Sequence, residues 1–352
     1  MQVEATLRAL MLFDVADGIQ LDLVSGLLGG SADSGVRSFG RTTSQTAPSP
    51  EYVRFERPPV IEHDPEGRIR YYEYGVISVE LDTAFSGDIE QLVQASSRWI
   101  SDSQAETRAR ELLRCRVERA AGAMTNPYAD WMSEDYYIVL MPNLQFDAQE
   151  FVDKCGMQIA QIVRGESKLL ADEERQDVLK ARISYYANDL AVIGWSAALI
   201  CDTPSGALPI VQLVEYANTQ LLEYRHYDDL LTRVLADVYR DLDEGTGFWA
   251  RWRMGRRAAR LNTIRLEVIE LTERTDNAIK FLSDMFYARL YRLAARRVGV
   301  PDYRNLVDEK LRTAGELYQF MTDQFQQGRG FVLEVMVVVI LVIELAFLFR
   351  GK

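Results

Sequence analysis

The feature that most constrains the fold of this chain is an apolar run near its C-terminal end. Residues 331–349 read FVLEVMVVVILVIELAFLF. As an α-helix this run would rise about 28 Å, close to the roughly 30 Å thickness of the hydrocarbon core of a bilayer. The sequence therefore predicts one transmembrane helix at residues 331–349. It also predicts a tail-anchored protein of an inner or cytoplasmic membrane, with its soluble domains on the cytoplasmic side.

Two acidic residues lie inside this predicted span, Glu334 and Glu344. Lipid disfavours a charge at this depth, so each carboxylate must either reach the membrane surface or find a partner. We expect Glu344 to pair with Arg350 or another group of a neighbouring copy, which would make the span an assembly surface. The alternatives are that both carboxylates reach the interface, or that the helix is buried in the core of an oligomer.

Composition limits the classes of protein to which the chain can belong. Its formal net charge of -12 argues against a general affinity for nucleic acid, because phosphate binding depends on basic surface. Cys115, Cys155 and Cys201 are far apart and form no CxxC pair, so neither a disulfide framework nor a zinc knuckle is indicated. Acidic residues outnumber basic ones near the N-terminus, which is unlike a secretory or transit sequence.

The first part of the chain mixes strand and helix patterns. Residues 7–13 (LRALMLF) are typical of a buried strand, and a short helix is expected after them. Residues 68–81 and 136–141 are rich in aromatic and β-branched side chains, as strands are, and residues 87–118 have helical spacing.

Helical spacing dominates after residue 147. Residues 190–201 (LAVIGWSAALIC) are apolar throughout but short, which favours a buried core helix over a second membrane span. Later positions three and four residues apart predict two long coiled-coil-like helices that turn near Gly299. The predicted fold class is therefore α+β, with a small N-terminal α/β domain (1–145, of which 29–50 are a flexible loop), an all-helical domain (146–244), a long antiparallel helical hairpin (248–330) and the transmembrane helix (331–349).

A short segment at the start of the predicted hairpin has the composition of a membrane-interface element. Tryptophan is favoured at the headgroup level and arginine reaches lipid phosphate. The residues concerned are Trp249, Arg251, Trp252, Arg253, Arg256 and Arg257. Two other interpretations stay open: a solvated helix start with the tryptophans in the core, or a site for RNA or another phosphate partner, which would use the arginines of residues 251–260.

Catalytic motifs are sparse. The sequence has no phosphate-binding glycine loop, no HExxH and no GxSxG, and its only histidines are His63 and His226. Glu223 and His226 are three residues apart, so they share one face of a helix, and di-metal carboxylate bundles use the same spacing. Asp229 extends that face. Such sites need a second ExxH motif, so a polar helix surface is the preferred interpretation and these three residues are only a weak metal candidate.

The order of several motifs resembles the Rmd/YagE family, named for its requirement in meiotic nuclear division, a domain of unknown function. These motifs are the early strand and helix of residues 7–28, the strand with Tyr74-Gly75-Val76, Arg329-x-x-x-Leu333-Glu334, and Ile343-Glu344. Ser78 stands where such proteins tend to have an aromatic residue. The resemblance implies an inner-membrane-attached protein that self-associates, with mitochondrial members that support organellar translation, and it implies no catalytic residues.

The sequence thus predicts a non-catalytic, membrane-anchored, oligomeric scaffold without a cofactor. Its expected partners are the lipid bilayer, anionic lipid and further copies of the chain. An RNA- or phosphate-associated membrane protein using the arginines of residues 251–260, and a metal-dependent enzyme around Glu223 and His226, are the alternative functions.

Overall fold

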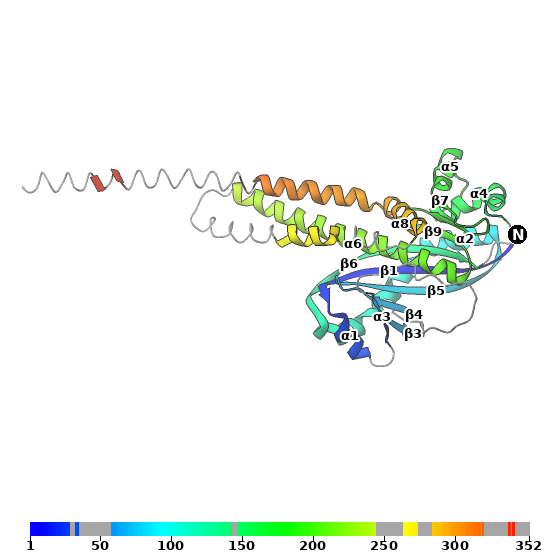
Figure 1. Cartoon of the computed structure of the whole chain (residues 1–352), viewed down its shortest axis with the longest axis horizontal. Helices are drawn as coiled ribbons and strands as arrows, with labels where there is room; N and C mark the ends of the chain where they lie inside the picture. The colour runs from blue at the N-terminus through cyan, green and yellow to red at the C-terminus, as the bar shows by residue number, and fades with distance from the viewer. Residues whose placement is uncertain are drawn as a thin grey trace, which may run out of the picture. The chain divides into compact units, whose positions relative to one another are not determined.

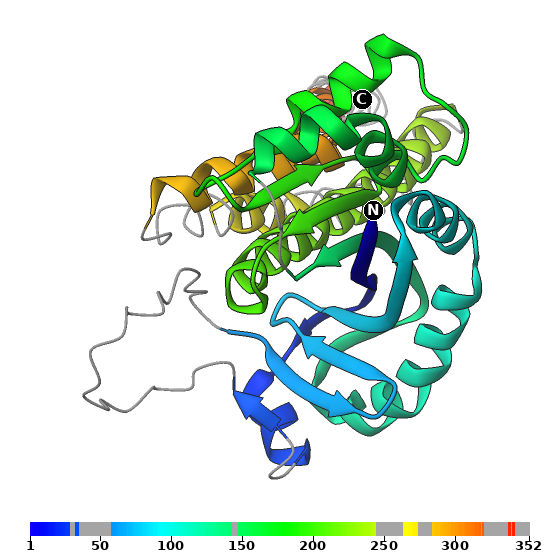
Figure 2. The same ribbon diagram turned by 90° about the vertical axis from the view of Figure 1, so that its right-hand side faces the viewer.

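The structure is a computed structural model that divides into two compact units. It describes residues 1–28, 32–34, 58–142, 147–243, 263–273 and 284–317, together with residues 319, 337, 338, 340 and 341. The sheet unit comprises residues 1–226 and 271–304, and the helical unit comprises residues 227–270 and 305–352. Figure 1 labels the elements, and Figure 2 shows the same ribbon turned by 90°.

The described strands form one mixed sheet in the order β2-β3-β4-β5-β1-β6-β9-β8-β7. All neighbours are antiparallel except β6 and β9, which run parallel. The strands are β1 (Gln2–Ile19), β2 (Ala32–Ser34), β3 (Val60–Asp64), β4 (Gly67–Tyr71), β5 (Val76–Asp88), β6 (Met124–Met141), β7 (Arg182–Ile183), β8 (Leu190–Ile193) and β9 (Ala197–Cys201).

Helices cover both faces of this sheet. They are α1 (Leu21–Leu28), α2 (Ile89–Ile100), α3 (Gln104–Ala120), a 3-10 turn at Ala121–Ala123, α4 (Ala148–Arg164), α5 (Asp172–Lys180), α6 (Pro204–Asp243) and α8 (Met285–Val298). Residues 263–273 and 300–317 are also helical. Asp88 begins α2 with a capping box closed by Gln91, and Gly299 ends α8 in the left-handed conformation.

The central strand β1 pairs with β5 and β6, and its residues from Leu7 to Ala16 are buried on both faces of the sheet. Successive side chains of a strand point to opposite faces of the sheet. Ala9, Met11 and Phe13 therefore point to one face, where they share a core cluster with Ala109 and Leu113 of α3. Arg8 and Asp14 point to the opposite face, where Glu215 and His226 of α6 contact Arg70 and Asp14.

A tight turn separates β4 from β5, so the single strand predicted at residues 68–81 is two strands. The amide of Tyr72 donates to the carbonyl of Val76 at 2.9 Å, and Gly75 has a φ of 93°. A Cβ on Gly75 would lie 1.7 Å from the carbonyl oxygen of Ala16 on β1. Only glycine fits this position, for both conformational and steric reasons.

The predicted all-helical region after residue 146 is wrong over residues 182–201. Residues 190–201 form β8 and β9, joined by a turn in which the amide of Gly194 donates to the carbonyl of Ala197 at 2.8 Å. A short run that is apolar on both sides fits a buried strand as well as a buried helix, and here β9 extends the sheet from β6. The predicted boundary between residues 145 and 146 thus falls inside one sheet.

Within the part of the chain that the structure describes, no helix is long and apolar enough to cross a membrane. This finding overturns the predicted C-terminal anchor and the inner or cytoplasmic membrane localisation that depended on it. Of residues 331–349, only 337, 338, 340 and 341 are among the described residues.

Several other predictions also concern segments outside the described residues. Of the loop predicted at residues 29–50, the structure describes only β2, which pairs with β3. Of the predicted hairpin at residues 248–330, it describes helices at 263–273, 285–298 and 300–317.

Candidate functional site

The face of the sheet under α6 is unusually polar for an interior. Strand alternation and register bring charged side chains of neighbouring strands together, since Arg8 lies opposite Asp82 and Arg68 lies opposite Glu80. With one carboxylate from α6 these residues form what we call the arginine–carboxylate network. Its members are Arg8, Arg68, Arg70, Glu80, Asp82 and Glu215.

Glu80 is the centre of this network. Its side chain is 1% exposed and lies 2.9 Å from Nη2 of Arg8 and 2.7 Å from Nη2 of Arg70, with Arg68 as a third ion-pair partner. Arg70 also donates through Nη1 to Oε2 of Glu215 at 2.8 Å. Arg70 thus joins the sheet to α6 through one buried guanidinium group.

The charges of the network balance, with three guanidinium groups against three carboxylates. Burial alone would lower the pKa of Arg70, but the charges of Glu215 and Glu80 outweigh it and raise this pKa. The phenol of Tyr72, which faces Glu215, has a pKa raised by its burial and by that carboxylate. Buried ions that neutralise one another hold elements together, and an arginine paired in this way supplies neither a nucleophile nor a mobile proton.

A second polar contact lies further along β1. Nδ1 of His226 lies 2.6 Å from Oδ2 of Asp14, and the imidazole stacks on Tyr128 at a centroid distance of 5.2 Å. The hydroxyl of Tyr128 donates to Asp17 at 2.6 Å. Burial raises the pKa of Asp14, although the hydrogen bond and charge of His226 oppose the shift.

The sequence-derived metal candidates do not come together around a common centre. His226 contacts Asp14, Glu223 is buried, and Asp229 forms an i,i+4 ion pair with Arg233 at 2.5 Å. Among the described residues, no group of three or more His, Cys, Asp and Glu side chains is arranged to hold a metal ion.

The other sequence-derived site residues are not among those that the structure describes. They are Trp249, Arg251, Trp252, Arg253, Arg256 and Arg257 of the proposed interface, and Glu334, Glu344 and Arg350 of the proposed assembly surface.

Sequence reasoning missed the arginine–carboxylate network, although a signal for it exists. Arg68 and Arg70 are two residues apart, as are Glu80 and Asp82, and both pairs occur in segments with strand composition. Alternation places the two charges of each pair on one face of the sheet. Opposite charges at period two in successive strands would have predicted a buried ionic face.

Comparison with known proteins places this fold in a family. The family model described as "Uncharacterized protein MJ0711, N-terminal domain" matches residues 4–207, which include most of β1, all of β2 to β9 and the start of α6. The chain belongs to this family. The resemblance to the Rmd/YagE family is therefore wrong, because neither the family model nor a listed relative points to it.

A relative in Methanocaldococcus jannaschii, "Uncharacterized protein MJ0711", is 21% identical over 217 residues. The aligned region covers 62% of this chain and 66% of the relative, slightly less than two thirds of the relative's length. No solved structure matches the chain.

Proposed function

We propose that the chain is a non-catalytic scaffold protein that assembles with further copies of itself. The observation that carries this proposal is an exposed apolar stripe on a helix of the helical unit. In the helix of residues 263–273, Leu266 is 60% exposed and Ile269 is 45% exposed, while Ile264 and Val268 on the same helix are buried. A helix that is apolar on two sides has one side available for a partner.

The helical unit has buried contacts of its own beside this stripe. Leu231, Val234 and Val307 are buried, and Nζ of Lys310 lies 2.6 Å from Oδ1 of Asp228 on α6. The second half of α6 and the helix of residues 300–317 are therefore joined. On the helix that carries the stripe, Ile264 and Val268 are buried, so this helix too is packed rather than isolated.

The arginine–carboxylate network favours a structural role for the sheet unit. It ties α6 to the sheet through Arg70 and Glu215, and α6 continues beyond residue 226 into the helical unit. Each of its carboxylates is paired with at least one guanidinium group of the network. This arrangement supports a sheet unit that anchors α6, with assembly carried by the helices.

The proposal is tested by exchanging the exposed stripe for polar side chains. The double variant Leu266→Gln, Ile269→Gln keeps good helix-forming residues while removing the apolar contact area. We expect it to shift the full chain to a smaller species in gel filtration at micromolar concentration. Arg265→Gln introduces the same side chain at an exposed position of the same helix and should leave the elution volume unchanged.

If both variants elute as the native chain does, the stripe is not an assembly surface. Circular dichroism of each variant separates loss of assembly from loss of folding, because a dissociated but folded chain keeps its helical signal.

A further inference from the structure

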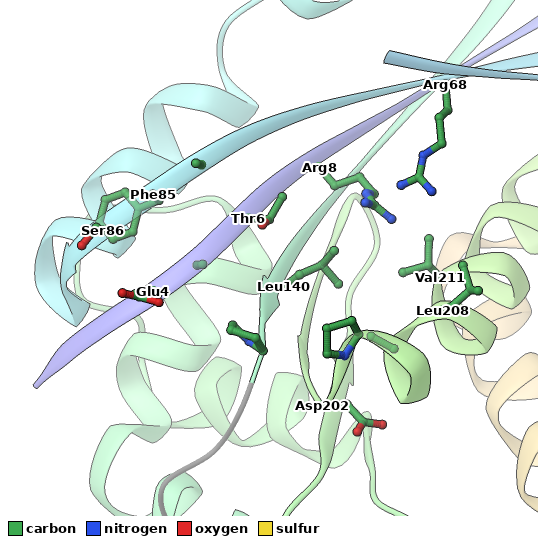
Figure 3. Close-up of a pocket in the computed structure, with 15 residues that line it drawn as sticks. Glu4, Thr6, Arg8, Arg68, Phe85, Ser86, Leu140, Asp202, Leu208 and Val211 are labelled. Atoms are coloured by element: carbon green, nitrogen blue, oxygen red, sulfur yellow. The ribbon is translucent and has the colours of Figure 1, made fainter. Parts of the chain in front are cut away.

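A cavity in the sheet unit has a division of charge that a ligand can match. Its volume is about 730 Å³, within the range of small-molecule sites. It lies between β1, β4, β5 and β6 on one side and the first two turns of α6 on the other (Figure 3). Apolar side chains from both sides form much of its wall, among them Leu140, Leu208 and Val211.

One end of the cavity is basic. Figure 3 shows the guanidinium groups of Arg8 and Arg68 close to one another, above Leu208 and Val211 of α6. The carboxylates of the network occupy Nε and Nη2 of Arg8 and Nη2 of Arg68. Within the described residues, Nη1 of Arg8 and both Nε and Nη1 of Arg68 make no hydrogen bond, and the Arg68 side chain is 32% exposed. These N–H groups suit a carboxylate.

The opposite end is acidic. Asp202 precedes α6, and its Oδ1 accepts a hydrogen bond from the amide of Thr203 at 2.6 Å, which leaves Oδ2 with no bond among the described residues. A Cβ on Gly206 would lie 2.2 Å from this Oδ2, so the glycine makes room for the carboxylate. Burial raises the pKa of Asp202, as does the charge of Asp189, and a bound cation would offset both effects. Glu4 also lines the cavity, from β1, but Figure 3 shows it beside Phe85 and Ser86, away from Asp202.

The separation of the two ends follows from element geometry. Val211, which lies near Arg8 and Arg68 in Figure 3, is about 10 Å beyond Pro204 at the helical rise, and Asp202 lies two residues before Pro204. An extended peptide of four residues spans about 13 Å between its ends.

We propose that this cavity binds a linear zwitterion, a peptide of about four residues, with its carboxylate on Arg68 and Arg8 and its ammonium group on Asp202. The apolar wall contacts the body of the ligand, and each charged end of the cavity receives the ligand group of opposite charge. A purely anionic ligand would meet the uncompensated carboxylate of Asp202 at the acidic end. This binding function is separate from assembly and does not depend on it.

The test compares four ligands on the full chain by isothermal titration calorimetry. They are tetra-alanine, its N-acetyl form, its C-terminal amide and the form blocked at both ends. We expect tetra-alanine to bind and each singly blocked peptide to bind at least about tenfold more weakly, since each loses one charged pair. The doubly blocked peptide should bind most weakly.

Two variants assign the ends. Asp202→Asn keeps a side-chain oxygen that can accept from the amide of Thr203, and it should weaken the binding of tetra-alanine about tenfold. Tetra-alanine and its N-acetyl form should then bind this variant with equal affinity. Arg68→Gln should also weaken the binding of tetra-alanine about tenfold. Tetra-alanine and its C-terminal amide should then bind this variant with equal affinity. Arg108→Gln, at an exposed arginine paired with Glu66 at 3.2 Å, is the control and should leave all affinities unchanged.

Three results would overturn the proposal: no binding of tetra-alanine at millimolar concentration, equal binding of the free and blocked peptides, or binding that Asp202→Asn and Arg68→Gln leave intact. Titrations of the native chain with the four peptides test the first two of these results, even if a variant fails to fold.

Discussion

The buried ion pair between Arg70 and Glu215 yields the sharpest prediction, because the structure gives both partners almost no solvent contact. Their side chains are 4% and 1% exposed, and the pair joins the sheet to α6. Arg70→Met leaves Glu215 buried without a counter-charge. Glu215→Leu leaves the network with three guanidinium groups against two carboxylates. Breaking a buried pair from one side costs about 3–5 kcal/mol, so each single variant should lose about that much unfolding free energy.

Removing both partners should cost far less than the two single losses together. In Arg70→Met/Glu215→Leu, the remaining Arg8 and Arg68 still balance Glu80 and Asp82. Replacing a buried pair by apolar side chains is often nearly neutral, so we expect a coupling energy of at least about 3 kcal/mol. Urea unfolding of the four proteins, followed by circular dichroism at pH 7, measures it. Additive losses would refute the reasoning, because the two charges would then not depend on each other.

Three further predictions concern the sheet unit. Gly75→Ala should lower the unfolding free energy by about 3 kcal/mol, because φ of Gly75 is 93° and a Cβ would collide with β1. Gly122→Ala is the control, since no atom lies within 4 Å of the new Cβ. It should change the unfolding free energy little in the same urea titration. Cys115 is exposed and should react with iodoacetamide in the folded chain. Cys201 should not react, because it is buried and burial raises the pKa of its thiol. Peptide mass mapping shows which of the two cysteines carries the label.

The pKa of Asp14 is raised in the folded state. The protonated carboxyl of Asp14 therefore contributes its full stability at a pH below its ordinary pKa of about 3.8, and this contribution is lost as the pH rises through the pKa of the folded state. The unfolding free energy of the native chain relative to Asp14→Asn should therefore decrease from pH 4 to pH 6, and a relative increase over that window would contradict this sign.

Local patterns predicted those elements whose signal is periodic and long. The strand β1 includes the predicted strand of residues 7–13, the short helix α1 follows it as expected, and α6 lies in the region after residue 147 where helical spacing dominates. The alternating burial of a strand and the apolar face of a helix both depend on residues that are close together in the sequence. For these elements, packing in the folded chain agrees with the local preference.

The failures share a cause, which is that the deciding contacts are distant in sequence. Residues 190–201 become strands because β9 pairs with β6, some sixty residues earlier. Gly75 is a turn residue because the carbonyl of Ala16 lies against it. The contact of His226 with Asp14 spans most of the sheet unit, so a motif on one helix could not reveal it.

The central claim is self-assembly, and the molar mass of the full chain in solution tests it most directly. Multi-angle light scattering across a concentration series from about 1 to 100 μM reports this mass without reference to shape. Exposed apolar side chains on a packed helical surface predict a whole-number multiple of the 40.2 kDa chain mass at the upper concentrations, decreasing toward 40.2 kDa on dilution if the contact is reversible. A mass of 40.2 kDa at every concentration would contradict the scaffold proposal.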